Sequence, residues 1–294
     1  MRREGYFLYD LRLQPGDKVG LIACSNGIPH SDKPEIDALV RTLQEMELIV
    51  DQASTIFCTN GPFSGTPQER ARELHRLFAD PEIKAIFDIS GGDAANQVLL
   101  HLDFDLIRSN AKPFFGYSDL SVLLNGLHHS AGLVTYHYHL RHLVQDQTGS
   151  QRQLFYDTFF KGSNSLFNFE YLWLRGSTMA GYVIGGNSRC FLKLAGTPYA
   201  PLYKDKLIFL EAMSGGQARI ASYIAQYEQL GVFQEAAGLI LGTFSQLEEE
   251  ISMAELEEMF LGVTEKYDLP VIKTQELGHN VDAHCLRIGG YYEF

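Results

Sequence analysis

The chain is constrained most by the way in which short apolar runs alternate with amphipathic stretches along its first half. Residues 18–23 and 85–89 are apolar runs of strand length. Residues 35–46 place their apolar side chains on one helical face, and residues 69–78 predict a second helix. Strands that alternate with helices in this way pair in parallel and are covered by the helices. The sequence therefore predicts an α/β fold with a mainly parallel sheet.

The same alternation returns after a less regular stretch. Residues 206–210 and 238–242 predict two strands, and residues 217–230 and 253–266 predict two helices. Residues 145–175, which come before them, are rich in Gln, Ser, Asn and aromatic residues and lose the periodicity. Such a stretch is typical of a connection between domains. The second half therefore predicts another α/β unit.

The chain length favours two medium-sized domains, because 294 residues are too many for one small core. We expect an N-terminal α/β domain over residues 1–150, a connecting segment over residues 151–175 and a smaller C-terminal α/β domain over residues 176–294. Hydrophobic residues make up 45% of the chain and aromatic residues 12%, which is enough to fill the cores of both domains.

The net charge of −12 limits the partners that we expect for the protein. A nucleic-acid backbone or an anionic membrane surface attracts clustered Lys and Arg, and the sequence contains no such cluster. No apolar run reaches the length of a membrane span, and the first residues do not read as a signal peptide. The four cysteines are scattered, with no C-x-x-C pair, which favours a reducing compartment. We therefore expect a cytoplasmic protein that binds neither nucleic acid nor membrane.

One serine lies at a corner of the kind that nucleophiles occupy. The predicted strand over residues 113–116 turns at Ser118 into a helix predicted over residues 120–128. At such a turn the hydroxyl projects from the carboxyl end of the strand, and the start of the helix offers free N–H groups to an oxyanion. We expect the backbone N–H of Asp119 to be one such donor. The alternative is that Ser118 or Asp119 merely caps the helix.

A second turn, Ser90-Gly91-Gly92-Asp93, joins a predicted strand to a helix predicted over residues 94–102. The backbone N–H groups of Gly91 and Gly92 are candidates to complete an oxyanion hole or to bind another anion. The alternative is an ordinary tight loop whose glycines permit a positive φ.

A nucleophilic serine needs a base, and His279 stands out among the ten histidines. It lies in a polar turn after the strand-like residues 270–272, where a side chain can reach a cleft. Glu211 follows the apolar run 207–210, so its carboxylate lies at the carboxyl end of a predicted strand and can orient an imidazole. The alternatives are a solvent-exposed histidine and a surface carboxylate that caps a helix or forms an ion pair.

Three further histidines, His137, His139 and His142, lie close together in the sequence. Alternate residues on a strand share a face, so His137 and His139 are expected side by side, as metal ligands would be. No nearby acid completes an obvious ligand set, and the flanking tyrosines suit a binding cleft or a domain seam equally well. We therefore predict no metal site and leave the role of these three histidines open.

Several segments, taken together, resemble the family of LD-carboxypeptidases and microcin-C-immunity-type serine peptidases. Residues 105–108 and 112–119 resemble the segment that carries the family's nucleophile, and Ser118 matches its serine. The later segments that resemble family motifs are the turn Gly185-Gly186-Asn187, the strand 209–211 with the triad acid, and Gly278-His279 with the triad histidine. The resemblance spans nearly the whole chain.

The resemblance implies a fold and a mechanism. The N-terminal domain is expected to be Rossmann-like, as in class I glutamine amidotransferases, and the active site is expected in a cleft between the domains. His279 would take the proton of Ser118 and later protonate the leaving amine, while Glu211 would fix the tautomer of the imidazole. The N–H groups of Asp119 and of the glycine turn would hold the oxyanion. This mechanism requires no metal and no organic cofactor, and a homodimer is the family's usual assembly.

The resemblance also implies a small peptide or peptide-like substrate. Family members of one kind release the terminal D-amino acid from cytoplasmic murein tetrapeptide by cutting an L,D bond during peptidoglycan recycling. Asp93 follows the glycine turn where an aromatic residue is usual, and Tyr138-His139 stand where Gly-Pro is usual. These positions are expected to line the substrate cleft. The family default is therefore a serine LD-carboxypeptidase acting on murein tetrapeptide.

Two alternatives to this function stay open. Family members of the second kind cleave aminoacyl-nucleotide amides such as microcin C, and Trp173 would then be a candidate to stack on an adenine. The other alternative is a non-catalytic protein that binds a small molecule in the same cleft. For such a protein, replacement of Ser118 would leave the biological effect unchanged.

Overall fold

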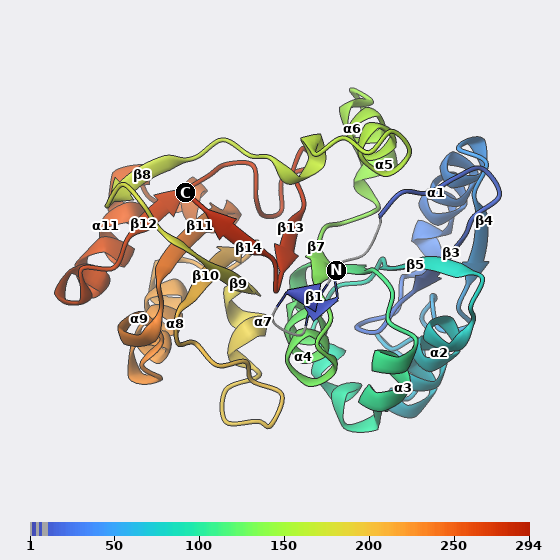
Figure 1. Cartoon of the computed structure of the whole chain (residues 1–294), viewed down its shortest axis with the longest axis horizontal. Coiled ribbons are helices and arrows are strands. Elements are labelled where there is room, and N and C mark those ends of the chain that lie inside the picture. Colours follow the sequence, from blue (N-terminus) through green and yellow to red (C-terminus); the bar gives the residue numbers. More distant parts are fainter. Residues whose placement is uncertain (1, 4–5, 8–10) are drawn as a thin grey trace.

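The computed structural model describes residues 2–3, 6–7 and 11–294. Two six-stranded sheets dominate it, one on each side of Figure 1, and helices flank each of them. The first sheet has the order β13-β7-β6-β5-β3-β4 and consists of β3 (Lys18–Ile22), β4 (Ile49–Gln52), β5 (Ile83–Asp88), β6 (Phe114–Gly116), β7 (Thr135–His137) and β13 (Leu286–Ile288). Its neighbouring strands are parallel, except that β13 runs antiparallel to β7.

The second sheet has the order β14-β9-β10-β11-β12-β8 and consists of β8 (Leu172–Arg175), β9 (Ala180–Asn187), β10 (Lys206–Ala212), β11 (Gly238–Phe244), β12 (Val271–Lys273) and β14 (Tyr291–Glu293). Its four central strands are parallel, and the two edge strands are antiparallel. A separate two-stranded sheet pairs β1 (Arg2–Arg3) with β2 (Tyr6–Phe7). The predicted two-part α/β fold is therefore confirmed.

The helices alternate with the strands. Those of the first half are α1 (Lys33–Glu45), α2 (Pro67–Ala79), α3 (Phe104–Ser109), α4 (Ser121–Ala131), α5 (His142–Gln145) and α6 (Ser150–Phe159). Those of the second half are α7 (Ser188–Leu192), α8 (Gln217–Gln229), α9 (Val232–Glu235), α10 (Ser245–Glu250) and α11 (Met253–Thr264). None of the helices in the described residues is both long enough and apolar enough to cross a bilayer.

Local sequence explains why several of these helices form where they do. Helix α1 buries Ile36, Leu39 and Leu43, whose spacing of three and four residues puts them on one face. Helix α2 begins with a capping box, in which the hydroxyl of Thr66 accepts from the N–H of Glu69 and the Glu69 carboxylate accepts from the N–H of Thr66. These local signals are readable in the sequence, and the predicted helices over residues 35–46 and 69–78 are confirmed to within two residues at each end.

The prediction of a helix over residues 94–102 is wrong. The chain there forms two short 3-10 turns, Ala95–Gln97 and Leu99–His101. The N–H of Ala94 donates to Ser25 Oγ (3.3 Å) and the N–H of Ala95 donates to Asp119 Oδ2 (2.9 Å). These side-chain acceptors hold the segment against neighbouring loops and compete with a regular helical hydrogen-bond ladder.

The stretch interpreted as a connection contains ordered structure. Helix α6 packs Phe155 and Phe159 into the core of the first half, with their ring centroids 4.6 Å apart. Strand β8 then forms the edge of the second sheet. The polar composition of this stretch hides the i, i+4 spacing of the two phenylalanines, so the sequence pattern did not predict the helix.

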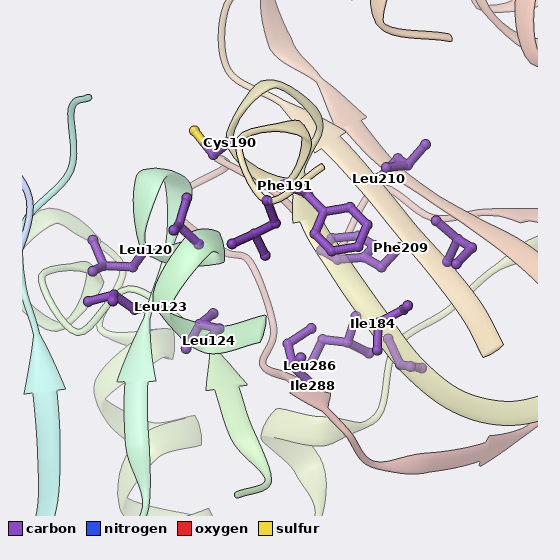
Figure 2. Packing of buried hydrophobic residues seen from close by; sticks show 14 of the residues in the cluster. Leu120, Leu123, Leu124, Ile184, Cys190, Phe191, Phe209, Leu210, Leu286 and Ile288 are labelled. Atoms are coloured by element: carbon purple, nitrogen blue, oxygen red, sulfur yellow. The ribbon is translucent and has the colours of Figure 1, made fainter. Parts of the chain in front are cut away.

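One hydrophobic cluster spans the two halves, and a second lies mainly in the first half. Figure 2 shows Leu120, directly before α4, and Leu124 of α4 in the same cluster as Phe191 of α7 and as Leu286 and Ile288 of β13. Because β13 comes from the C-terminal end of the chain and pairs with β7, strand membership does not follow chain order. The division into residues 1–150, 151–175 and 176–294 therefore stays a prediction.

Candidate active site

The candidate nucleophile lies in a strained turn between β6 and α4. Ser118 has a φ of 56°, in the left-handed region that residues other than glycine rarely occupy. The turn is tight because a Cβ on Gly116 would lie only 2.8 Å from the Cβ of Leu120. The side chain of Ser118 is partly exposed. A strained, accessible serine between a strand and a helix is the arrangement found at nucleophile elbows.

The capping alternative finds no support at this turn. Neither the 3-10 turn Ser118–Leu120 nor α4 has a side-chain cap hydrogen bond at its start. The carboxylate of Asp119 is instead fully buried, and its Oδ2 accepts from Ser25 Oγ at 2.6 Å. Its Oδ1 forms an ion pair at 2.5 Å with Nζ of Lys193, the residue directly after α7. The side chain of Asp119 therefore ties the serine turn to both halves of the protein.

The glycine turn is held beside the serine turn. The N–H of Ala95, just after the glycine turn, donates to Asp119 Oδ2, which joins the two turns. Gly92 has a φ of 118°, and a Cβ there would lie 2.3 Å from Cγ of Asn26, so only glycine fits. Within the described residues, no hydrogen bond uses the N–H groups of Gly91, Gly92 or Asp119. The N–H groups of these three residues are therefore available to another acceptor.

Two basic side chains, one in α7 and one directly after it, hold the glycine turn from the other half of the protein. Arg189 donates to the Gly92 carbonyl at 3.0 Å and pairs with the Asp93 carboxylate. Lys193 donates to the Asp93 carbonyl at 2.9 Å as well as pairing with Asp119. Neither residue was predicted from the sequence. Their i, i+4 spacing after the turn Gly185-Gly186-Asn187 was the available signal, because it puts two positive charges on one helical face.

Glu211 and His279 are hydrogen bonded in the interior. Glu211 lies near the end of β10, and His279 lies in the loop that follows β12. The Nδ1 of His279 is 2.5 Å from Oε2 of Glu211, and the side chains are 3% and 0% exposed. Because a carboxylate only accepts, the ring proton of neutral His279 lies on Nδ1 and its Nε2 carries a lone pair. Within the described residues, Nε2 of His279 has no hydrogen-bond partner, Ser118 included.

The electrostatics of this pair favour an ionised carboxylate. Burial by itself would raise the pKa of Glu211, but the charge and hydrogen bond of His279 outweigh it. The neighbouring His137 and a hydrogen bond from the side chain of Asn187 add to this effect, so the pKa of Glu211 is lowered. An ionised Glu211 can hold the ring of His279 in one tautomer and stabilise it when it gains a proton.

The ring of Tyr117, directly before the serine, joins these groups. Its centroid is 4.3 Å from that of His279 and 4.4 Å from that of His139, which is stacked on it. His137 and His142 lie farther out, at 5.9 and 6.1 Å. Burial lowers the pKa of both His137 and His142 to about 4, so they are neutral at pH 7. In the part of the chain that the structure describes, no three His, Cys, Asp or Glu side chains converge as metal ligands would.

The seam between the halves fixes the serine helix against the second sheet. The side chain of Asn125 in α4 bonds both the N–H (2.9 Å) and the carbonyl (2.7 Å) of Gly185. The hydroxyl of Ser121 accepts from the N–H of Asn187 at 2.8 Å. A Cβ on Gly186 would lie 2.3 Å from that hydroxyl, which explains the glycines of this turn. The serine turn therefore comes to lie beside the strands that carry Glu211 and precede His279.

These features define a two-part α/β protein in which a strained serine turn of one half lies next to a glutamate–histidine pair of the other. Residues 19–138 match the family model of the LD-carboxypeptidase N-terminal domain, and residues 180–294 match that of the C-terminal domain. The two matches cover most of the chain. The protein therefore belongs to the LD-carboxypeptidase family, as predicted, and is a hydrolase of the peptidase type.

Individual relatives agree with this assignment. The chain is 28% identical to the probable murein peptide carboxypeptidase of Bacillus subtilis strain 168, over 94% of this chain and 88% of the relative. It is 24% identical to the microcin C7 self-immunity protein MccF of Escherichia coli, over 94% and 90%. The crystal structure of an MccF-like protein from Bacillus anthracis superimposes with a TM-score of 0.85 at 26% identity, covering 96% of this chain and 94% of that chain.

Proposed function

We propose that the protein is a serine LD-carboxypeptidase in which Ser118 is the nucleophile, His279 the general base and acid, and Glu211 the residue that orients His279. The observation that carries this proposal is the 2.5 Å hydrogen bond between Glu211 and Nδ1 of His279, which leaves Nε2 as a free acceptor beside the serine turn. A histidine with that tautomer is what a serine nucleophile requires.

The reaction follows from these positions. Nε2 of His279 takes the proton of Ser118 as its Oγ attacks the carbonyl carbon of the scissile bond. The tetrahedral intermediate collapses as the imidazolium gives that proton to the leaving amine, which departs with the terminal residue. Water, deprotonated by the same histidine, then hydrolyses the acyl-enzyme on Ser118. In structures without substrate such proton-transfer contacts are often open and tighten on binding.

The oxyanion would be stabilised by the free N–H groups of Asp119 and of Gly91 and Gly92. The hydrogen bond from the Ala95 N–H to the Asp119 side chain keeps the two turns adjacent, so the donors are fixed before substrate binds. Removing one such preorganised donor typically costs about 3 kcal/mol of barrier.

The substrate we propose is a murein tetrapeptide, cut at its terminal L,D bond with release of D-alanine, as in peptidoglycan recycling. The name of the Bacillus subtilis relative, a murein peptide carboxypeptidase, supports this choice. The test is the release of D-alanine from purified tetrapeptide, measured by mass spectrometry for the wild type and for Ser118→Ala. Release by the wild type alone is expected. Equal release by both proteins would contradict the role of Ser118.

The alternative function, hydrolysis of aminoacyl-nucleotide amides, depended on Trp173 as the residue that would stack on an adenine. Trp173 lies on the edge strand β8 and packs against the hydrophobic core, with Tyr171 edge-on to its ring at 6.2 Å. Its pairing partner in the sheet is Ile272 of β12. Hydrolysis of an aminoacyl-nucleotide amide but not of the tetrapeptide would reverse the order of the two substrates.

The location and assembly are parts of the same proposal. We place the protein in the cytoplasm, where a murein tetrapeptide would reach it during recycling. All four cysteines are free, and Cys24, Cys190 and Cys285 are buried, which suits a reducing compartment. We also propose a homodimer, from the family resemblance. Gel filtration with light scattering would give twice the mass of 33.1 kDa if this is right.

A further inference from the structure

The second carboxylate oxygen of Glu211 has an unusual environment. Oε2 bonds to His279, whereas Oε1 is buried and has no hydrogen-bond partner within the described residues. The nearest ion-pair contact of Oε1 is Nε2 of His137 at 4.0 Å, and that nitrogen is also buried and unpartnered. Two buried polar atoms without partners are costly, so their placement opposite each other needs a reason.

The ring of His137 is held firmly in place from several sides. It lies at the end of β7, paired with Gly116 of β6 and with Leu286 of β13. Its ring packs edge-on against Phe209 of β10, with the centroids 5.2 Å apart. The ring also lies against the turn at Gly186, where a Cβ would be 3.5 Å from Cδ2 of His137. The direction of Nε2 toward Glu211 is therefore set by the packing of both sheets.

The charges around His137 determine which nitrogen carries its proton. Burial lowers its pKa to about 4, so the ring is neutral at pH 7 and has a single N–H. The groups that favour its protonated form are Glu211 and its own backbone carbonyl, with which the ring is hydrogen bonded, and His279 opposes that form. His139 and His142 also interact with it electrostatically. Because a carboxylate can only accept, the tautomer that attracts Glu211 is the one with the proton on Nε2.

We propose that His137 is a positioning residue for the reaction, whose Nε2–H attracts Oε1 of Glu211 and fixes the carboxylate so that Oε2 serves His279. The carboxylate of Glu211 would then lie between two imidazoles. That of His279 acts as the base, and that of His137 exchanges no proton with the substrate. This inference rests on the proposed roles of Glu211 and His279. It assigns a function to one of the three histidines that the sequence left open.

The test compares two substitutions at His137 with one at a matched buried histidine. His137→Phe keeps a planar ring but removes the N–H. His137→Gln keeps an N–H donor at about the position of Nε2. His128 is a suitable control, because burial also lowers its pKa to about 4 but its Nδ1 lies 2.9 Å from the Leu133 carbonyl. His128→Gln should therefore change neither readout described below.

The first readout is steady-state hydrolysis of the tetrapeptide or of a simple ester. His137→Phe should lower kcat by about 10- to 100-fold, the range that hydrogen bonds to charged groups carry, and leave KM within about twofold. His137→Gln should recover most of the loss. A kcat for His137→Phe within about twofold of wild type would overturn the inference, and so would equal losses in both variants.

The second readout does not depend on turnover. The proton between His279 and Glu211 should give a low-field proton NMR resonance, identified by its absence in His279→Phe. In His137→Phe this resonance should move upfield or vanish through exchange with water, and in His137→Gln it should persist. An unchanged resonance in His137→Phe would overturn the inference even if no substrate were hydrolysed. Equal turnover by wild type and Ser118→Ala would instead contradict only the proposed function.

Discussion

The carboxylate of Asp119, one residue after the candidate nucleophile, forms a 2.5 Å ion pair with Nζ of Lys193 in the other half of the protein. The carboxylate is fully buried and the lysine side chain is 19% exposed. Lys193 also bonds the Asp93 carbonyl in the glycine turn. One side chain of the second half therefore holds both segments that carry the proposed oxyanion donors, which makes the geometry of the site dependent on the seam between the halves.

Replacing Lys193 should damage stability and activity together. Lys193→Met leaves the buried carboxylate of Asp119 without its ion-pair partner, and breaking a buried pair in this way costs about 3–5 kcal/mol. We expect a loss of that order in the free energy of unfolding, measured with urea, and a lower kcat in the protein that remains folded. Lys266→Met is the control, because Lys266 pairs with Glu228 at the surface and should change little. A wild-type stability for Lys193→Met would contradict this account.

Removing any one of Ser118, Glu211 and His279 should abolish hydrolysis. Each alanine variant should lose about 10⁴-fold or more in kcat, and the double variant Ser118→Ala/His279→Ala should be no worse than the worse single variant, because such residues act as a unit. Circular dichroism should show an intact fold for each. Losses that multiply in the double variant would argue that the residues act independently.

The backbone conformation of Ser118 should be strained, and this strain should lower the free energy of unfolding. Its φ of 56° is unfavourable for any residue with a Cβ, so Ser118→Gly should unfold at a higher urea concentration than Ser118→Ala. We expect a difference of about 1 kcal/mol in the free energy of unfolding, while both variants are inactive. If Ser118→Gly were less stable than Ser118→Ala, the turn would not be strained.

The buried neutral histidines should make the fold sensitive to mild acid. The pKa of His142 is lowered to about 4 by burial, whereas the unfolded chain has the ordinary value of about 6.5. Between about pH 4 and pH 6.5 the unfolded state binds more protons than the folded state. The contribution of His142 to the free energy of unfolding is therefore fully present above about pH 6.5 and is lost as the pH falls toward 4. Each such histidine contributes a slope of up to about 1.4 kcal/mol per pH unit.

Urea unfolding at pH 7 and at pH 5 measures this effect. His142→Gln should reduce the loss of stability between the two pH values relative to wild type, because one titrating group is gone. Asp268→Asn, at an exposed turn after α11, serves as the control for the effect of a substitution as such. The same loss in His142→Gln as in wild type would show that this imidazole is not neutral in the folded protein.

Much of the fold was predictable because its signals are local. The apolar spacing of Ile36, Leu39 and Leu43 predicts α1, and the tight turn at Gly116 predicts a serine corner between a strand and a helix. Local patterns failed where distant groups decide the backbone. The predicted helix over residues 94–102 is replaced by 3-10 turns, because the Asp119 carboxylate takes the N–H of Ala95.

The candidate site was predictable only as a set of separate residues. Ser118, Glu211 and His279 were each identified by position and by family resemblance, but nothing in the sequence measures the distance between Glu211 and His279. The sequence also offered no reason to select Lys193 from the 24 Lys and Arg residues. Its partner Asp119 lies 74 positions away, so the pair exists only once the two sheets have packed.

The sequence by itself determined the alternation of strands and helices, the serine corner and the family, because these depend on residues that are neighbours along the chain or on motifs read directly. Only the tertiary structure decided that β13 returns to the first sheet, that α7 holds the glycine turn, and that His137 faces Glu211. Those contacts depend on the packing of one half against the other, and the free energy of that packing is spread over a shared core that no short segment contains.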